Sequence, residues 1–277
     1  MKTRIAINTQ LADTQRAFDS VAATYDSPRG NNALIQRMRA SMWAVMAQQF
    51  SHGDRLLDLG CGTGIDALHF AQLGYTVVAT DWSAQMVARA AGRAQDHHLE
   101  DRLIARQVGI QELEKLSGAE FDGAFDGIYS NFGPLNCAPD LRQVSQQCAR
   151  LLKPGGKMVF TVIGRLCPWE VGHYVLRRRF KRALVRYARN ITPVNLNSHT
   201  VWTRYYFPRE FFAAFKPAFD LTHHRAFSLF VPPPYLTGLY DKARPAFNAL
   251  GWLDDHLGHW PLLRDAGDHF LMILTKR

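Results

Sequence analysis

The chain has 277 residues, of which 47% are hydrophobic, and it carries a formal net charge of +9. This length is sufficient to bury a large hydrophobic core, and the positive charge predicts anionic partners without choosing among phosphates, nucleic acid and membrane surfaces. Because the four cysteines lie far apart and form no Cys-x-x-Cys pair, the sequence indicates neither a zinc knuckle nor a disulfide framework, and a reducing compartment is expected.

Residues 11–50 are predicted to be helical. Apolar side chains recur there at spacings of three and four residues, as on the buried face of a helix: Leu34, Met38, Met42, Trp43 and Met46. No export signal is recognisable before this region, and no stretch of the chain approaches the roughly 18 apolar residues of a membrane span. We therefore expect a cytoplasmic protein.

From Arg55 to Gly164, short apolar strands alternate with helical stretches. The expected strands are Arg55–Leu59, Thr76–Thr80, Leu103–Val108, Gly127–Ser130 and Lys157–Val162. Such alternation predicts a parallel, doubly wound sheet with helices on both faces.

The first of these strands runs into a glycine turn, Leu-Leu-Asp-Leu-Gly-Cys-Gly-Thr-Gly, over Leu56–Gly64. Glycines at a strand end let the backbone turn tightly and approach a ligand, and Asp81 follows Gly60 at the spacing where a carboxylate can bind ribose hydroxyls. A dinucleotide fingerprint would require a third glycine where Ile65 stands, and the carboxylate of Asp58 would repel a pyrophosphate. The pattern therefore predicts an adenosine-containing cofactor that bears a cationic or amine group.

Beyond Gly164 the alternation is interrupted for about forty residues. It resumes with a predicted helix at Pro208–Phe215 and a strand at Asp220–Val231, and a second helical insertion, Tyr235–Asp265, precedes the last strand, His269–Thr275. Both insertions are expected near the carboxyl edge of the sheet, where ligands bind in open α/β folds. We interpret them as a substrate cap.

The first insertion contains a basic segment, Val171–Asn190, that is predicted to form an amphipathic helix. Its cations surround an apolar set of Leu176, Phe180, Leu184 and Tyr187, and they are Arg177, Arg178, Arg179, Lys181, Arg182, Arg186 and Arg189. Such a helix is consistent with a solvated face, a phosphate-bearing or lipid substrate, an anionic membrane or RNA. Aromatic residues around it favour an apolar substrate pocket: Trp169, Tyr174, Trp202, Tyr205, Tyr206, Phe207 and Phe230.

These motifs resemble the class I S-adenosylmethionine-dependent methyltransferases. The similarity covers the first motif, Leu57–Gly64, then Asp81-Trp82-Ser83 with Met86, the strand Phe125–Asn131 and the turn Leu151–Lys157. Residues Phe18–Asp26 are similar to the lid helix of the small-molecule branch, such as quinone-biosynthesis methyltransferases. The resemblance implies an α/β, Rossmann-like, doubly wound seven-stranded sheet whose last strand is antiparallel, with N-terminal lid helices and a helical cap inserted after the fifth and sixth strands.

On this basis we expect residues 1–277 to form a single methyltransferase domain. Residues 1–53 would supply the lid helices and residues 54–164 the cofactor-binding core. Residues 165–207 and 232–266 would form the substrate cap, and residues 208–231 and 267–277 the final helix and strands.

The resemblance also implies the residues that hold S-adenosylmethionine. They are Tyr25, Asp58, Gly60, Cys61, Gly62, Gly64, Asp81, Trp82, Met86, Gly109, Ile110, Gln111, Ser130, Asn131 and Phe132. Many relatives carry an acidic residue where Ile110 stands, so the bond to the adenine amino group is either missing or supplied by Gln111. Ser83 is expected to cap the following helix.

The implied reaction is methyl transfer to a small, apolar or amphiphilic acceptor at oxygen, carbon or nitrogen, driven mainly by proximity and the exclusion of water. The sequence Asn131-Phe132-Gly133-Pro134 departs from the pattern of enzymes that methylate base amines. If a general base is used, the candidates are His173, His199, Tyr206 and His223. No metal is expected, because the paired histidines His223-His224 and His256-x-x-His259 lack a third ligand.

Two alternatives stay open: an RNA or protein methyltransferase that docks through the Arg177–Arg189 helix, and a non-catalytic protein that only binds the cofactor. Nucleic acid is the less favoured partner, and peripheral contact with the inner face of an anionic membrane is a further expectation.

Overall fold

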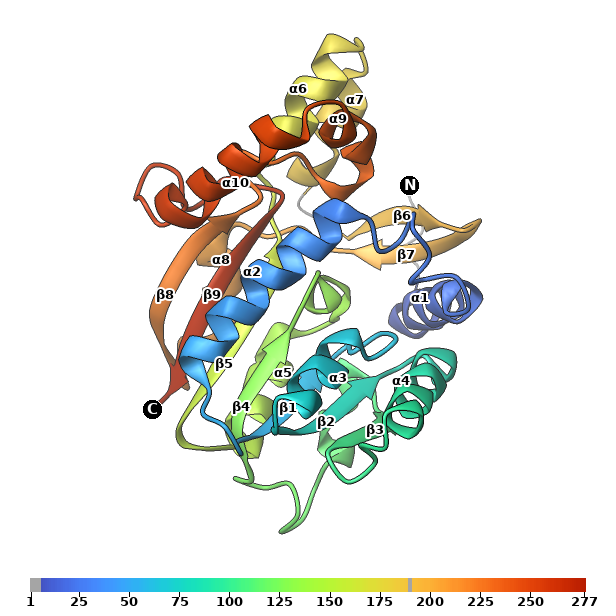
Figure 1. Cartoon of the computed structure of the whole chain (residues 1–277), viewed down its shortest axis with the longest axis vertical. Helices are drawn as coiled ribbons and strands as arrows, with labels where there is room; N and C mark the ends of the chain where they lie inside the picture. The colour runs from blue at the N-terminus through green and yellow to red at the C-terminus, as the bar shows by residue number, and fades with distance from the viewer. Residues whose placement is uncertain (1–5, 189–190) are drawn as a thin grey trace.

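A seven-stranded sheet lies at the centre of the structure (Figure 1), which is a computed structural model that describes residues 6–188 and 191–277. Its strands are β1 (Arg55–Leu59), β2 (Thr76–Asp81), β3 (Leu103–Gln107), β4 (Phe125–Ser130), β5 (Leu152–Ile163), β8 (Phe219–Phe227) and β9 (His269–Lys276). Their order is β3-β2-β1-β4-β5-β9-β8, and β9 runs antiparallel to both β5 and β8. The doubly wound sheet with an antiparallel last strand is therefore confirmed.

Helices cover both faces of this sheet. The α-helices are α1 (Ile7–Val21), α2 (Ala33–Gln49), α3 (Ile65–Gln72), α4 (Ala84–Asp96), α5 (Leu141–Leu151), α6 (Pro168–Leu176), α7 (Phe180–Ala183), α8 (Pro208–Phe215), α9 (Thr237–Lys242) and α10 (Arg244–Leu257). Short 3-10 helices are η1 (Ile110–Lys115), η2 (Pro134–Cys137), η3 (Val185–Tyr187) and η4 (Pro234–Leu236). In Figure 1, α2 crosses the near face of the sheet, and α5 and α8 lie behind it.

Two apolar cores sit on opposite faces of the sheet. One joins η1, α5 and α8 to the strands through side chains such as Leu113, Val144 and Phe211. The other joins α2 and α3 to the strands through Met42 and Phe70, which are fully buried. Because strand side chains alternate between the two faces, Phe160 lies in the first core and the neighbouring Val159 in the second.

Two helices, α2 and α4, begin directly after polar residues whose side chains cap them. The side chain of Ser83 accepts a hydrogen bond from the amide of Met86 at 3.1 Å, which confirms it as the cap of α4. Asn32 caps α2 in the same way by accepting from the amides of Leu34 and Ile35. The cap of α4 directly follows the carboxyl end of β2, and the cap of α2 lies against η4, where the Asn32 side chain also donates to the carbonyl of Pro234 at 3.2 Å.

The insertion after β5 differs from the expected single helix over Val171–Asn190. It contains α6, α7 and η3, followed by a two-stranded sheet of β6 (Thr192–Leu196) and β7 (His199–Thr203). The helix prediction is wrong because like charges at i, i+4, such as Arg178 and Arg182, disfavour helix, and Arg178 takes a positive φ of 56° that ends α6. Arg189 lies outside the described residues.

The second insertion is helical, as predicted, and contains η4, α9 and α10. It follows β8, which ends at Phe227 rather than at Val231 because Ser228 takes a positive φ of 57°. The helices of both insertions, α6, α7, α9 and α10, lie together at one end of the molecule in Figure 1, whereas the β6–β7 hairpin of the first insertion lies beside α1. Among the described residues, no helix is both long enough and apolar enough to cross a membrane.

Candidate functional site

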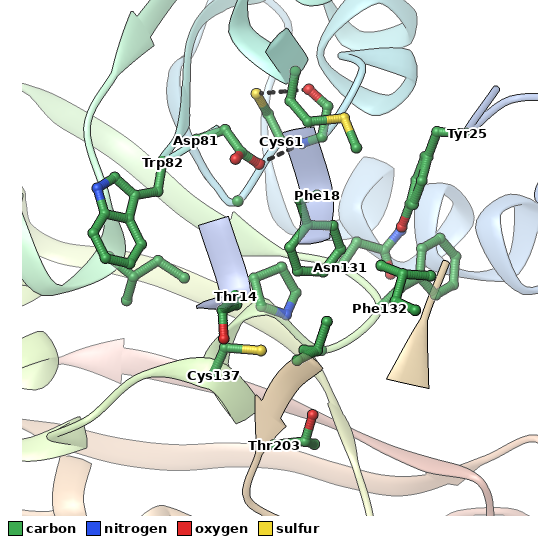
Figure 2. Close-up of a pocket in the computed structure, with 18 of the residues that line it drawn as sticks. Thr14, Phe18, Tyr25, Cys61, Asp81, Trp82, Asn131, Phe132, Cys137 and Thr203 are labelled. Atoms are coloured by element: carbon green, nitrogen blue, oxygen red, sulfur yellow. Dashed lines mark hydrogen bonds between the residues drawn. The ribbon is translucent and has the colours of Figure 1, made fainter. Parts of the chain in front are cut away.

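A cavity of about 350 Å³ opens at the carboxyl ends of β1, β2 and β4. Its walls come from the glycine turn, from α1 and α2, and from the β6–β7 hairpin. Figure 2 shows Asp81 and Cys61 at one end of this cavity and Cys137 and Thr203 at the other, with Phe18 and Asn131 between them. The volume lies in the range of small-molecule sites.

The glycine turn after β1 forms one wall and requires glycine at several positions. Gly60, Gly62 and Gly64 take positive φ values of 75°, 54° and 81°, which disfavour residues with a Cβ. A Cβ on Gly60 would lie 2.4 Å from the Cβ of Pro134, and one on Gly64 would lie 2.7 Å from that of Ala90. The bare backbone of this turn is therefore available to approach a ligand.

Asp81 stands at the end of β2 beside this turn. Its carboxylate accepts hydrogen bonds from the amides of Gly62 at 2.9 Å and Ser83 at 2.8 Å. Burial raises the pKa of Asp81, and these two amides oppose the rise. A carboxylate can accept about four hydrogen bonds, so it retains the capacity to accept from a pair of hydroxyl groups.

Asp58 lies buried beneath the same turn, with 2% of its surface exposed. Its Oδ2 atom makes no hydrogen bond of standard geometry among the described residues, and the neighbouring Tyr129 hydroxyl is the one side chain whose hydrogen bonding lowers the pKa of Asp58. Burial, reinforced by the nearby Asp66 carboxylate, raises the pKa of Asp58 well above its usual value. Such an unpaired buried acceptor is costly unless a ligand satisfies it, and an ammonium group would do so.

A hydrogen-bonded network joins α2 to the end of β4 and includes two residues that sequence reasoning missed, Arg39 and Asp66. Asp66 accepts from Arg39 at 2.5 Å, from the indole of Trp43 at 2.8 Å and from the side-chain amide of Asn131 at 3.0 Å. Arg39 and Asp66 both line the cavity. The guanidinium of Arg39 therefore presents a fixed cation that can bind a carboxylate.

Phe132 follows Asn131 and is held in an unusual backbone conformation, with φ of 62°. Its amide donates to the hydroxyl of Thr161 at 2.8 Å, and that hydroxyl donates to Asn131 at 2.8 Å. The guanidinium of Arg39 lies 5.1 Å from the centre of the Phe132 ring. Strained non-glycine residues of this kind persist where the surrounding structure fixes them, often at functional sites.

The far wall of the cavity is mainly apolar. It is built by α1, the β4–α5 connection, the end of β5 and the β6–β7 hairpin, and its apolar members are Leu11, Phe18, Pro134, Ala138, Ile163, Val194, Leu196 and Val201. Sequence reasoning missed this wall, because it placed the substrate pocket among aromatic residues of the insertion. Trp202, Tyr205 and Tyr206 do not line the cavity, and Trp169 lines a second one beside α6.

The structure brings most of the predicted cofactor residues together. Those that line the cavity are Tyr25, Gly60, Cys61, Gly62, Asp81, Trp82, Met86, Ile110, Gln111, Asn131 and Phe132. Gly64, Gly109 and Ser130 support it from behind, and Asp58 lies beneath the turn. The hydroxyl of Ser130, for example, donates to the carbonyl of Leu59 at 2.7 Å and ties β4 to β1.

The four candidate bases lie away from this cavity. His173 lines the second cavity, His199 is exposed at the hairpin, His223 lies on β8, and Tyr206 packs in the core against Phe211. Burial raises the pKa of the Cys137 thiol to about 12, so this cavity-lining group is protonated at neutral pH. No cluster of three metal-binding side chains occurs among the described residues.

Comparison with known proteins gives a consistent result for the core. Residues 56–156 match the family described as methyltransferase domain. The chain is similar to the ubiquinone biosynthesis O-methyltransferase of Cronobacter sakazakii, with 30% identity over 59% of this chain and 65% of the relative. It is also similar to the ubiquinone/menaquinone biosynthesis C-methyltransferase of Bdellovibrio bacteriovorus, with 30% identity over 54% of this chain and 61% of the relative. The matches thus span less than two thirds of these relatives.

Solved structures share the fold at lower identity. Geranyl diphosphate C-methyltransferase from Streptomyces coelicolor is 16% identical, with a TM-score of 0.54 over 86% of this chain and 78% of that protein. The cyclase SpnF is 20% identical, with a TM-score of 0.55 over 86% of this chain and 80% of that protein. The glycine turn, the sheet order and the family match agree: residues 56–156 match a methyltransferase domain, and the chain is similar to class I S-adenosylmethionine-dependent methyltransferases.

Proposed function

We propose that this protein transfers a methyl group from S-adenosylmethionine to a small, apolar or amphiphilic acceptor. The observation that carries the proposal is one continuous cavity that joins the glycine turn and Asp81 to an apolar wall built by α1 and the β6–β7 hairpin. The two relatives compared by sequence identity act in quinone biosynthesis, one as an O- and the other as a C-methyltransferase, which supports a quinone-like acceptor and leaves the methylated atom open.

The residues of the cavity fit the charged groups of this cofactor. The unpaired Oδ2 of Asp58 and the cavity-facing Arg39 offer opposite charges for the ammonium and carboxylate of its methionine part. Asp81 is placed for the ribose hydroxyls, and Trp82, Ile110 and Gln111 line the same end of the cavity for the adenine. At Gly62, where a Cβ would meet nothing closer than Tyr25 at 3.9 Å, the backbone of the turn faces space that the rest of the cofactor can occupy.

When bound, the cofactor supplies an activated sulfonium methyl group. The protein then has to orient the acceptor and exclude water, and such alignment can contribute about 7–11 kcal/mol to the lowering of a barrier. No histidine of the described chain lines the cavity, and Cys61 and Cys137 are held protonated because burial raises the pKa of each thiol. We therefore assign Cys61 and Cys137 to positioning the bound molecules rather than to removing a proton.

The protein is proposed to work in the cytoplasm, because its four cysteines are all free. Contact with the inner face of a membrane is compatible with an amphiphilic acceptor.

The test is to incubate the protein with methyl-labelled S-adenosylmethionine and an extract of its source cells, and then to separate organic, aqueous and macromolecular fractions. Label is expected in the organic fraction. Asp81→Asn should weaken cofactor binding by about 10- to 100-fold, since it removes a charged acceptor of two hydrogen bonds, whereas exposed Asp101→Asn should not.

Other outcomes separate the alternatives. Label in RNA or protein would replace this proposal with a macromolecular methyltransferase. Cofactor binding without transfer to any fraction would favour the non-catalytic binder, and unchanged affinity and activity of Asp81→Asn would contradict the assigned site.

A further inference from the structure

The tip of the first insertion exposes large apolar side chains to solvent. We define the insertion tip as residues 176–184, the connection from α6 through α7. Leu176, Phe180 and Leu184 are 87%, 59% and 60% exposed. In Figure 1 this segment projects at one end of the long axis of the molecule. Apolar side chains exposed together to this extent mark interaction surfaces in soluble proteins.

The insertion tip is also strongly cationic. Arg177, Arg178, Arg179, Lys181 and Arg182 are all exposed, and the ion pairs of the described residues include none of them. No aspartate or glutamate occurs in the sequence between Glu170 and Glu210. The positive charge of the tip is therefore not neutralised by nearby carboxylates of its own segment, and it is available to an anionic partner.

The insertion tip is anchored by buried residues. Its apolar side chains are therefore exposed from an ordered segment and not from a loosely held loop. Directly after the tip, the buried Arg186 bonds to Glu170 at 2.7 Å and to Asp268 at 2.7 Å. Ala183, within the tip, is 3% exposed. The orientation of the tip is thus set by a buried ionic cluster that joins it to the start of β9.

The apolar surface continues onto the second insertion. A cavity of about 350 Å³ between α6 and η4–α9 is lined by Trp169, Leu176, Leu236 and Leu239, among others. Tyr235 and Leu239 are 51% and 43% exposed. The tip and this cavity together form an apolar surface bordered by cations.

We infer that the insertion tip docks on the surface of an anionic phospholipid bilayer. Lipid headgroups complement the five cations, and the boundary between headgroups and acyl chains accepts the side chains of Leu176, Phe180 and Leu184. RNA would satisfy the cations but leave these apolar side chains in water. The inference goes beyond the proposed methyl transfer and does not depend on it.

The test is co-sedimentation of the intact protein with phosphatidylcholine vesicles, with and without 40% phosphatidylglycerol, at low and high salt. Binding is expected only to the anionic vesicles and should weaken with salt. Each basic residue near such a surface contributes a factor of about five to partitioning, so Arg177→Gln/Arg179→Gln/Arg182→Gln should reduce it on the order of 100-fold. Leu176→Ser/Phe180→Ser should also reduce binding, by at least about tenfold.

Two control variants test whether binding depends on where the substituted residues lie rather than on how many charges or apolar side chains are removed. Arg89→Gln/Arg142→Gln/Lys216→Gln removes the same number of exposed cations elsewhere, and Leu73→Ser removes a side chain that is 46% exposed on α3–β2. Both should bind vesicles like the unmodified protein. Thermal unfolding and cofactor binding of all variants check that they remain folded.

Three results would overturn the inference: no binding to anionic vesicles at low salt, equal loss in the matched charge control, or full binding by Leu176→Ser/Phe180→Ser. If that apolar variant binds vesicles normally and the unmodified protein prefers RNA, the tip is a nucleic-acid surface. Failure of methyl transfer in the labelling experiment leaves the vesicle result unaffected, so the two proposals fail separately.

Discussion

Asp58 is a buried carboxyl group whose environment in the free protein disfavours its charged form. The pKa of this carboxyl group is raised in the folded state by burial and by Asp66, from an ordinary value of 3.8. Below that value the group is protonated both folded and unfolded and costs nothing. The cost begins as the pH rises above 3.8, where the unfolded chain ionises first, and it grows until the pH reaches the raised pKa of the folded state.

Asp58→Asn should therefore stabilise the free protein and weaken its cofactor binding. The amide removes the buried charge, so the thermal midpoint should rise at pH 8 and change less at low pH. S-adenosylhomocysteine, which keeps the ammonium group, should bind about 10- to 100-fold more weakly, because a charge-assisted hydrogen bond is lost. Scanning calorimetry and titration calorimetry measure the two effects.

Exposed Asp101→Asn serves as the control and should change neither quantity. A lower midpoint for Asp58→Asn with unchanged affinity would show that Asp58 has a purely structural role.

Among the elements, the two insertions and β9 are joined by one buried ionic cluster. Arg186 pairs with Glu170 and Asp268, and the hydroxyl of Tyr235 donates to Glu170 at 2.9 Å. Although burial opposes ionisation, the Arg186 guanidinium and then His269 lower the pKa of Asp268 below its usual value. Its contribution to stability is thus present above pH 3.8 and is lost as the pH falls through the lower folded pKa.

Arg186→Gln should destabilise the protein by about 3–5 kcal/mol at neutral pH, because it leaves two buried carboxylates without their partner. Urea unfolding measures the change. Adding Asp268→Asn to this variant should recover part of the loss, since one uncompensated charge disappears. The exposed neighbour Arg182→Gln should stay within about 0.5 kcal/mol of the unmodified protein, and an equal loss there would argue against the buried cluster as the cause.

The elements that the sequence predicts well are those whose signal is local. Strand β1 and its glycine turn lie within ten consecutive residues, and helix α8 begins at a proline that fixes its start, so both agree with expectation. The prediction for the basic segment is wrong because its amphipathic pattern implies that Leu176 and Phe180 are buried, whereas they are 87% and 59% exposed. Arg39 and Thr203 escaped notice because only the docking of α2 and the hairpin brings them to the cavity.

At the scale of the whole molecule, the cavity is closed by parts of the chain that are far apart in sequence. On helix α1, the carboxylate of Asp19 accepts a hydrogen bond from the hydroxyl of Ser83 at 2.5 Å. In the turn after α1, the carboxylate of Asp26 accepts a hydrogen bond from the hydroxyl of Thr63 at 2.9 Å. The hairpin contacts α1 in turn, because the indole of Trp202 donates to Asp13 at 3.1 Å. Helix α1 and the hairpin therefore form one connected wall over the glycine turn.

Because α1 and the hairpin are connected, we expect cofactor binding to stabilise residues beyond the glycine turn. Filling the cavity should stabilise α1 and the β6–β7 hairpin together, since both line it and each supports the other. Hydrogen exchange of the protein with S-adenosylhomocysteine should slow in residues 7–21 and 192–203, while the β8 edge, which lies outside the cavity, should not change. At 100 times the dissociation constant, global stability should rise by about 2.7 kcal/mol. The same cofactor concentration is only about 1 to 10 times the dissociation constant expected for Asp81→Asn, so it should protect both segments less in that variant. Protection confined to the glycine turn would mean that α1 and the hairpin close independently of the cofactor.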